Sequence, residues 1–383
     1  MKKIFSMALA VVMVMSLGFA IPAEATVADK MEISAEQQEY IKDYVCDQVV
    51  QSYSDYYVIP SISAEILSTV TDDPNVISVK VLVSFTKVLK AESAYDLPYI
   101  QGLQAGIADL TNPDEIASAE AYLNLWVNEL EGLYIGKEQM ETAEFCVELS
   151  REAAMTYSLN NSAISIYYFD TLSEKALSMD AFQPETEDHL YASGVLDAQE
   201  MVSFSDVTAP MSMTRAPSSP TDYDRVAARD YARKWVCGRT DCGHSCYNND
   251  EYDDQSGSGG DCANYVSQCI RAGGIKTEPG VWEPYVRQWN TVSFTGRYDG
   301  ICEYMVNSGY FFDAGTNKTK AFAGSIISWL DYGHVGLVDQ NDTVKLTYCA
   351  HTTDELSTSF EYLSRVKFYV PVWDSYAGCY TPQ

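Results

Sequence analysis

The apolar and polar positions of the first half follow two periods, and each period predicts a type of element. Apolar residues at helical spacing predict one helix after Ser34 and another from Asn112-Pro113, both with capping residues at their start. Strict alternation over residues 77–86 predicts a half-buried strand. Further strands are predicted at 142–149, 156–159 and 163–169. This mixture predicts an α+β region.

The second half has its own pattern of elements. Residues 198–222 lose all periodicity in a stretch of Pro and Ser, which predicts a linker. A helix is predicted to open at Tyr223, and an eleven-residue helical pattern follows the glycine-rich stretch 257–260 and ends at Gly273-Gly274. Strands are predicted at 325–330, from His334 onward, and at 343–350. We therefore expect an N-terminal α+β domain at 26–197 and a second domain at 223–383.

Residues 1–25 have the features of a secretory signal peptide. Lys2 and Lys3 precede an apolar stretch, and Ala23-Glu-Ala25 is a small-x-small cleavage site. No later stretch is long and apolar enough to cross a bilayer. We therefore expect a secreted protein with no membrane contact after signal removal, and association with the cell wall is left open.

The charge of the chain argues against polyanionic partners. Residues 26–205 carry 31 acidic against 8 basic residues, and residues 206–383 carry 22 against 15. Neither half offers the basic patch that nucleic acid requires. We expect the acidity of the first domain to keep the protein soluble.

One cysteine lies where a nucleophile would be expected. Gly257-Ser-Gly-Gly-Asp-Cys262 places Cys262 in the first turn of the predicted helix, behind Asp261 as N-cap. Free backbone N–H groups and the helix dipole there favour a thiolate. The glycines leave that end of the helix open to a substrate. The backbone N–H of Cys262 can form part of an oxyanion hole, and Tyr252 and Gln255 are candidate side-chain donors.

A thiol nucleophile needs a base, and histidine is the usual one near neutral pH. His334 leads an apolar strand and follows Gly333, which places it well to face a cleft. A partner for its second ring nitrogen is expected from His351, at the end of the next strand, with Asp354 and Asp339 as alternatives. A register slip of one residue would exchange the strand faces and alter this third assignment.

The second domain resembles the putative amidase domain family of exported Gram-positive proteins, related to papain-like cysteine hydrolases of the NlpC and CHAP kind. The resemblance rests on the opening segment 223–235, Gly260-Asp-Cys-Ala-Asn-Tyr-Val-Ser-Gln-Cys269, Gly333-His-Val-Gly-Leu-Val338 and His351-Thr-Thr-Asp354. It implies a helix carrying Cys262 packed on an antiparallel sheet carrying His334, and hydrolysis of an amide bond. Ser325 stands where the family often has an acid, and the segment Cys237–Cys246 has no counterpart.

That segment offers four soft ligands, Cys237, Cys242, His244 and Cys246. Ten cysteines in an exported chain favour disulfides here, with zinc or free thiols as alternatives. The acidic run 248–254 lacks EF-hand spacing and is better explained as a solvated loop than as a calcium site. We expect no cofactor and no catalytic metal.

The sequence thus predicts an exported cysteine amidase or peptidase. Its substrate would be a peptide or a peptidoglycan stem amide, cleaved through an acyl-enzyme with Cys262 as nucleophile and His334 as base. The alternatives are a non-catalytic binding module on the same fold, a zinc-dependent hydrolase, and transfer of the acyl group to an amine.

Overall fold

The computed structural model describes residues 33–383 apart from 72, 74, 156–162, 205–222, 240–241, 259, 279–280, 285–299, 362–363, 375–378 and 382–383. The predicted signal peptide, the predicted strand 156–159 and most of the predicted linker lie outside the described residues. A search of the described helices found none with the length and apolar character needed to cross a bilayer.

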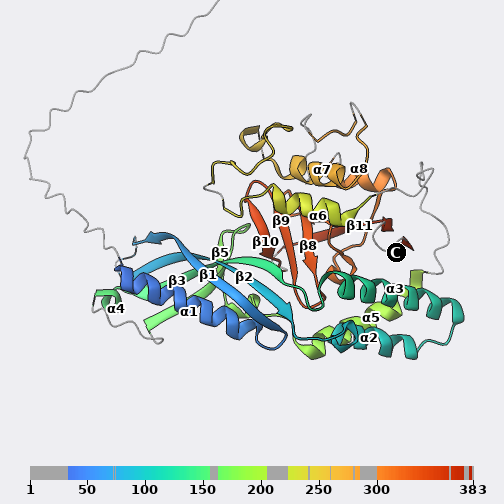
Figure 1. The fold of residues 1–383 in the computed structure, drawn as a ribbon, viewed down its shortest axis with the longest axis horizontal. Coiled ribbons are helices and arrows are strands. Elements are labelled where there is room, and N and C mark those ends of the chain that lie inside the picture. The colour runs from blue at the N-terminus through green and yellow to red at the C-terminus, as the bar shows by residue number, and fades with distance from the viewer. Residues whose placement is uncertain are drawn as a thin grey trace, which may run out of the picture. The chain divides into compact units, whose positions relative to one another are not determined.

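The N-terminal part of the fold is a long helix on a strongly twisted group of strands. Helix α1 (Ala35–Tyr53) begins at Ser34 with the predicted capping box. Strands β1 (Tyr57–Val70) and β2 (Val76–Leu89) form an antiparallel pair, and every second side chain of β2 is buried, as the alternation predicts. Strand β3 (Gln139–Ser150) pairs with β2, and α1 crosses these strands in Figure 1.

Three helices pack together beside this sheet: α2 (Pro98–Ala108), α3 (Pro113–Leu133) and α5 (Glu187–Phe204). Helices α2 and α5 touch through glycines, since a Cβ atom on Gly102 would lie 2.0 Å from the backbone oxygen of Tyr191. Farther along, Gly106 faces the side chain of Ala198. This contact explains why α5 continues past residue 197, where the sequence predicted the first domain to end.

The remaining elements complete the fold as follows: η1 (Ala94–Asp96), α4 (Arg151–Met155), β4 (Ile164–Asp170), β5 (Lys175–Leu177), η3 (Met179–Ala181), α6 (Arg225–Lys234), η5 (Ser256–Ser258), α7 (Cys262–Ala272), α8 (Ile301–Asn307), β6 (Phe311–Asp313), η6 (Lys318–Lys320), β7 (Ile326–Trp329), β8 (His334–Asn341), β9 (Leu346–Ala350), β10 (Glu355–Ser359), β11 (Val366–Pro371), β12 (Trp373–Asp374) and β13 (Cys379–Tyr380). Helices α6 and α7 cover one face of the strands around β8 (Figure 1).

A single sheet runs through both predicted domains. Among the described residues its order is β1-β2-β3-β10-β9-β8-β7-β11-β6, with β4 and β5 attached to β3. The strands from β10 to β6 are antiparallel neighbours, whereas β3 and β10 are parallel and meet at the pair Thr142 and Thr358. Residues Ile33–Gln383 accordingly form one compact unit.

Buried charges join the two halves beside this sheet. The ammonium of Lys87 lies 2.6 Å from Glu141 on β3 and 3.9 Å from Asp342, which follows β8. Tyr57 donates a hydrogen bond to the same Asp342 carboxylate at 2.9 Å. Burial acts to lower the pKa of Lys87, but the two carboxylates outweigh burial and raise it. The lysine therefore stays charged, and loss of either carboxylate would leave a buried charge without one of its partners, one in each half of the chain.

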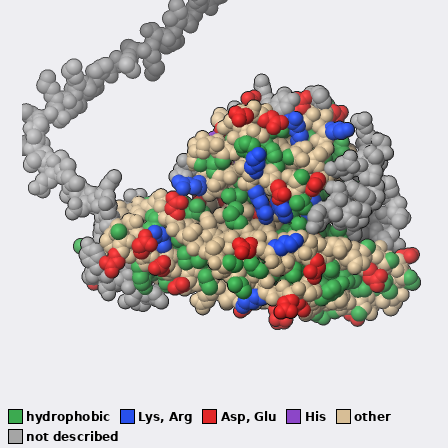
Figure 2. All heavy atoms as spheres, viewed as in Figure 1, with side chains coloured by type: hydrophobic (Ala, Val, Ile, Leu, Met, Phe, Trp, Pro, Cys, Tyr) green, Lys and Arg blue, Asp and Glu red, His purple; other side chains and the backbone are tan. Residues whose placement is uncertain are grey.

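The surface charge is unevenly placed. In the view of Figure 2, many Lys and Arg side chains lie over the region that contains α6, whereas acidic side chains are spread along the region of the N-terminal strands and helices. This agrees with the acidic excess of residues 26–205.

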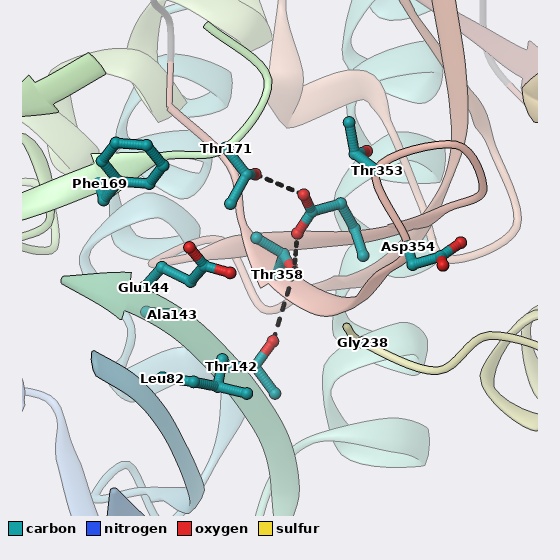
Figure 3. A pocket seen from close by; sticks show the side chains of 11 residues that line it. Leu82, Thr142, Ala143, Glu144, Phe169, Thr171, Gly238, Thr353, Asp354 and Thr358 are labelled. Carbon is teal, nitrogen blue, oxygen red and sulfur yellow. Dashed lines mark hydrogen bonds between the residues drawn. The ribbon is translucent and has the colours of Figure 1, made fainter. Parts of the chain in front are cut away.

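A small hollow marks the place where β3, the end of β4 and β10 meet (Figure 3). Glu355 on β10 accepts hydrogen bonds there from the hydroxyls of Thr171 and Thr358. The carboxylate of Glu144 lines the same hollow. Burial, opposed by the two hydroxyls and reinforced by Glu144, raises the pKa of Glu355 to about 7.

Replacing Glu355 should change how stability depends on pH. Between its ordinary pKa of 4.5 and about 7, folded Glu355 holds a proton that the unfolded chain has released, so the wild type loses stability as pH rises through this window. We expect Glu355→Gln to gain about 3 kcal/mol relative to the wild type between about pH 4 and about pH 8. Denaturant unfolding at both pH values measures this difference, and a constant difference would contradict it.

Candidate active site

The candidate site is built around the first turn of α7. Gly260 precedes it with a positive φ of 116°, and a Cβ atom there would lie 3.3 Å from the Thr352 hydroxyl. Asp261 follows at the N-cap position, and Cys262 is the first residue of the helix. The helix begins where the sequence predicts it, but the expected side-chain cap is wrong, because the Asp261 carboxylate makes no hydrogen bond to the helix backbone.

The carboxylate of Asp261 instead ties three segments together. It accepts hydrogen bonds from the backbone N–H of Gln255 at 2.9 Å and from the amide of Asn264 at 2.8 Å. Its second oxygen lies 2.5 Å from Nδ1 of His351, and its backbone N–H donates to Thr352. The side chain is 1% exposed, so all these interactions operate away from water.

His351 has both ring nitrogens engaged. Nε2 lies 2.6 Å from the backbone oxygen of Trp235, which can only accept, so Nε2 carries a proton. Nδ1 faces the Asp261 carboxylate at 2.5 Å. The ring is sandwiched between Tyr247 and Tyr265, whose ring centroids lie at 3.6 and 3.8 Å.

The sequence predicted that His351 would orient His334. In the described structure both ring nitrogens of His351 are engaged elsewhere, so no hydrogen bond joins the two rings. Side chains alternate along strands, and the register decides their faces. Leu337 pairs with Cys349, and both face the core cluster beneath α7, so His351 turns to that side. His334 pairs with Trp329, which belongs to the cluster on the other face. His351 therefore holds Asp261 beside Cys262 rather than holding His334.

Cys262 is a buried thiol beside the start of β8. Its side chain is 9% exposed, and burial raises its pKa, although the backbone amides of Val335 and Ala263 act in the opposite direction. The expectation that the helix start would yield a resting thiolate is therefore wrong, because loss of hydration outweighs these donors. The sulfur nevertheless lies against the residue that follows His334.

His334 is buried and neutral. Its ring centroid lies 5.4 Å from that of Trp329, and burial lowers its pKa from 6.5 to about 4. Within the described residues, its Nε2 has no hydrogen-bond partner. No hydrogen bond between this ring and the Cys262 thiol is present in the described part of the chain. The two groups are neighbours through the backbone at Val335.

The other predicted site residues divide into two groups. Gln255 lies at the site, through the hydrogen bond from its backbone to Asp261. Tyr252 accepts a hydrogen bond from Arg271, nine positions beyond Cys262 and about 14 Å along the helix. Asp339 pairs with Arg233, and Asp354 accepts from Tyr247, so neither alternative orienter has a described bond to His334.

Sequence reasoning missed the groups that surround His351. Tyr247 and Tyr265 are aromatic residues of the kind that usually belongs to a core, and the Trp235 backbone oxygen leaves no sequence signal. Asn264 lies in the same motif as Asp261, and Thr352 lies in the same motif as His351. This closeness in sequence was the signal that could have found them.

A double-mutant cycle would test whether Asp261 and His351 act as a pair. Removing one partner of a buried pair leaves the other buried and unpaired, so Asp261→Asn and His351→Gln should each lower the free energy of unfolding by about 3–5 kcal/mol. The double variant should lose less than the sum, with a coupling of about 1 kcal/mol or more. Denaturant unfolding of all four proteins measures this coupling, and additive losses would exclude the pairing.

Residues 222–370 match the model of the putative amidase domain family. No curated protein and no solved structure matches the chain. The matched range contains α6, α7, strands β6 to β10 and all but the last residue of β11, and it includes Asp261, Cys262, His334 and His351. Residues 222–370 of this chain belong to the putative amidase domain family.

Proposed function

We propose that this protein is an exported, cysteine-dependent amide hydrolase that cleaves peptide or peptidoglycan stem amides. The family match suggests amide hydrolysis. The finer proposal rests on one observation: the Cys262 sulfur, at the start of α7, lies against the backbone of the residue that follows a neutral His334.

The resting protonation states define the first step. A buried thiol with a raised pKa and a neutral imidazole make His334 a general base rather than the partner of a preformed ion pair. His334 takes the thiol proton as the sulfur attacks the amide carbonyl, and it returns this proton to the departing amine. Water, deprotonated by the same imidazole, then attacks the thioester, the bond to the Cys262 sulfur breaks, and the imidazole returns the proton to that sulfur.

Two local features would support this reaction. The amide groups at the start of α7 are not used by the helix itself, and the backbone N–H of Cys262 would stabilise the developing oxyanion. His334 must reach the thiol from its place beside Trp329, on the face of the sheet opposite α7, so the start of β8 has to rearrange before the ring can take the thiol proton. The Asp261–His351 pair is expected to fix the position of Cys262 throughout.

The pH dependence of amide hydrolysis follows from the pKa of His334. Protonation removes the base, so kcat/KM should fall only as pH drops through about 4, rather than through the ordinary value of 6.5. The profile should be measured from pH–rate data on released amines. An acid limb centred near 6.5 would contradict a buried base, and a full rate in His334→Gln would exclude this residue.

Removing the nucleophile should abolish hydrolysis. We expect Cys262→Ser to lower the rate of amine release from purified cell walls or mixed peptides about 1,000-fold or more. Cys46→Ser, a thiol on α1, is the matched control and should retain full activity. Equal activity of the two variants would contradict the proposal.

The same experiment distinguishes the alternative, a non-catalytic binding module. That alternative is favoured by the absence of a described hydrogen bond between Cys262 and His334. It predicts that wild type and Cys262→Ser bind cell walls equally and release no amine. Secretion is tested separately, because a mature chain beginning at Thr26 in the culture medium would support export and an intact Met1 would contradict it.

A further inference from the structure

Three cysteine sulfurs converge in the loop between α6 and α7. The sulfurs of Cys237, Cys242 and Cys246 all lie within 4.8 Å of one another. The Cys237 sulfur is close enough to bond to either of the other two. Because a sulfur forms only one disulfide bond, a cystine would leave one of the three thiols over, whereas a single metal ion would engage all three.

The backbone of the loop turns sharply beside these residues. Gly238 follows Cys237 with a φ of 68°, and Gly243 follows Cys242 with a φ of 62°. Glycine adopts this left-handed conformation without a steric penalty. His244 continues the second turn with a φ of 57°. The two turns bring cysteines that are four to nine positions apart to one point.

A carboxylate lies beside one of the three sulfurs, that of Cys242. Oδ2 of Asp354 is 3.7 Å from the Cys242 sulfur, while Oδ1 accepts a hydrogen bond of 2.5 Å from Tyr247. Figure 3 shows the Asp354 carboxylate directed away from Thr171 and Thr358. A ligating carboxylate whose other oxygen is held by a hydrogen-bond donor is a common feature of metal sites.

In the described part of the chain, several cysteines outside this loop lie in no disulfide bond. Cys269 and Cys349 are fully buried, and both are thiols, as are Cys46 and Cys146. Disulfides among the described residues are confined to contacts of Cys237. Three thiolates with one carboxylate form a donor set suited to tetrahedral Zn²⁺.

We propose that Cys237, Cys242 and Cys246 bind a thiophilic divalent cation of the Zn²⁺ type, with Asp354 as the fourth ligand. The sequence favoured disulfides because the chain has ten cysteines and is expected to be exported, whereas the two glycine turns bring the three sulfurs to one point where a single ion could bind them. The site is structural, because four protein ligands leave no open position for a substrate.

The site would support the wall of the candidate active site. Tyr247 follows Cys246 directly, and it both donates to Asp354 and stacks on His351. His351 in turn binds the Asp261 carboxylate. A metal ion that fixes the loop would therefore fix Tyr247 against the pair that positions Cys262.

Metal content of the full-length protein is the direct test. Protein purified with Zn²⁺ and without reductant should hold about one zinc per chain. Replacement by Co²⁺ should produce the intense near-ultraviolet absorption of thiolate–cobalt bonds. Intact mass should show all three thiols reduced, with alkylation of these residues blocked until a chelator is added. A mass lower by two hydrogens, without bound metal, would overturn the proposal in favour of a disulfide.

Variants locate the ligands and separate this test from the catalytic one. Cys237→Ser and Cys242→Ser should lose the metal, while Cys46→Ser and Cys262→Ser should keep it whether or not the protein hydrolyses amides. Tyr247→Phe should weaken Zn²⁺ binding about 10–100-fold, because it removes the donor that holds Asp354. Undiminished zinc in both loop variants would overturn the assignment, and the cobalt spectrum of the wild type needs no variant to fold.

Discussion

The arrangement of the site depends on one buried carboxylate. Asp261 binds the loop at Gln255, the helix at Asn264 and the end of β9 at His351, all without access to water. Each of these segments carries part of the site, and the backbone of Asp261 adds two further bonds, from its N–H to Thr352 and from the N–H of Tyr265 to its oxygen. The cost of burying the carboxylate is offset only while all three partners are present. The position of Cys262 is therefore set by a shared charge rather than by the helix alone.

The continuous sheet relates this site to the rest of the chain. Strand β10 pairs on one side with β9, which leads into His351, and on the other side with β3 of the first half. Lys87 adds a buried charge that is attracted to carboxylates of both halves. The acidic first half is thus a packed extension of the sheet. Its strands and the buried contacts of Lys87 support β10, which is separated from β8 by β9 alone.

Sequence patterns predicted the local elements well, because a helix start or a strand depends on neighbouring residues. The helix that begins at Cys262 and the strand led by His334 are both present. The partner of His351 could not be predicted, because the face of a side chain depends on the register of β8 and β9. The direction of the pKa shift of Cys262 could not be predicted from the sequence either, because it depends on how much protein covers the sulfur. The joining of β3 to β10 involves residues more than 200 positions apart, which no local period records.

The stacking of His351 has a consequence for spectroscopy. Tyrosine rings lie on both faces of its imidazole at 3.6 and 3.8 Å, so the carbon-bound protons of that ring lie in the shielding regions of two aromatic systems. Their magnetic resonance signals should therefore be displaced far upfield from those of His189, which is exposed on α5. The imidazole becomes a built-in reporter whose signal records any loosening of the tyrosines around it.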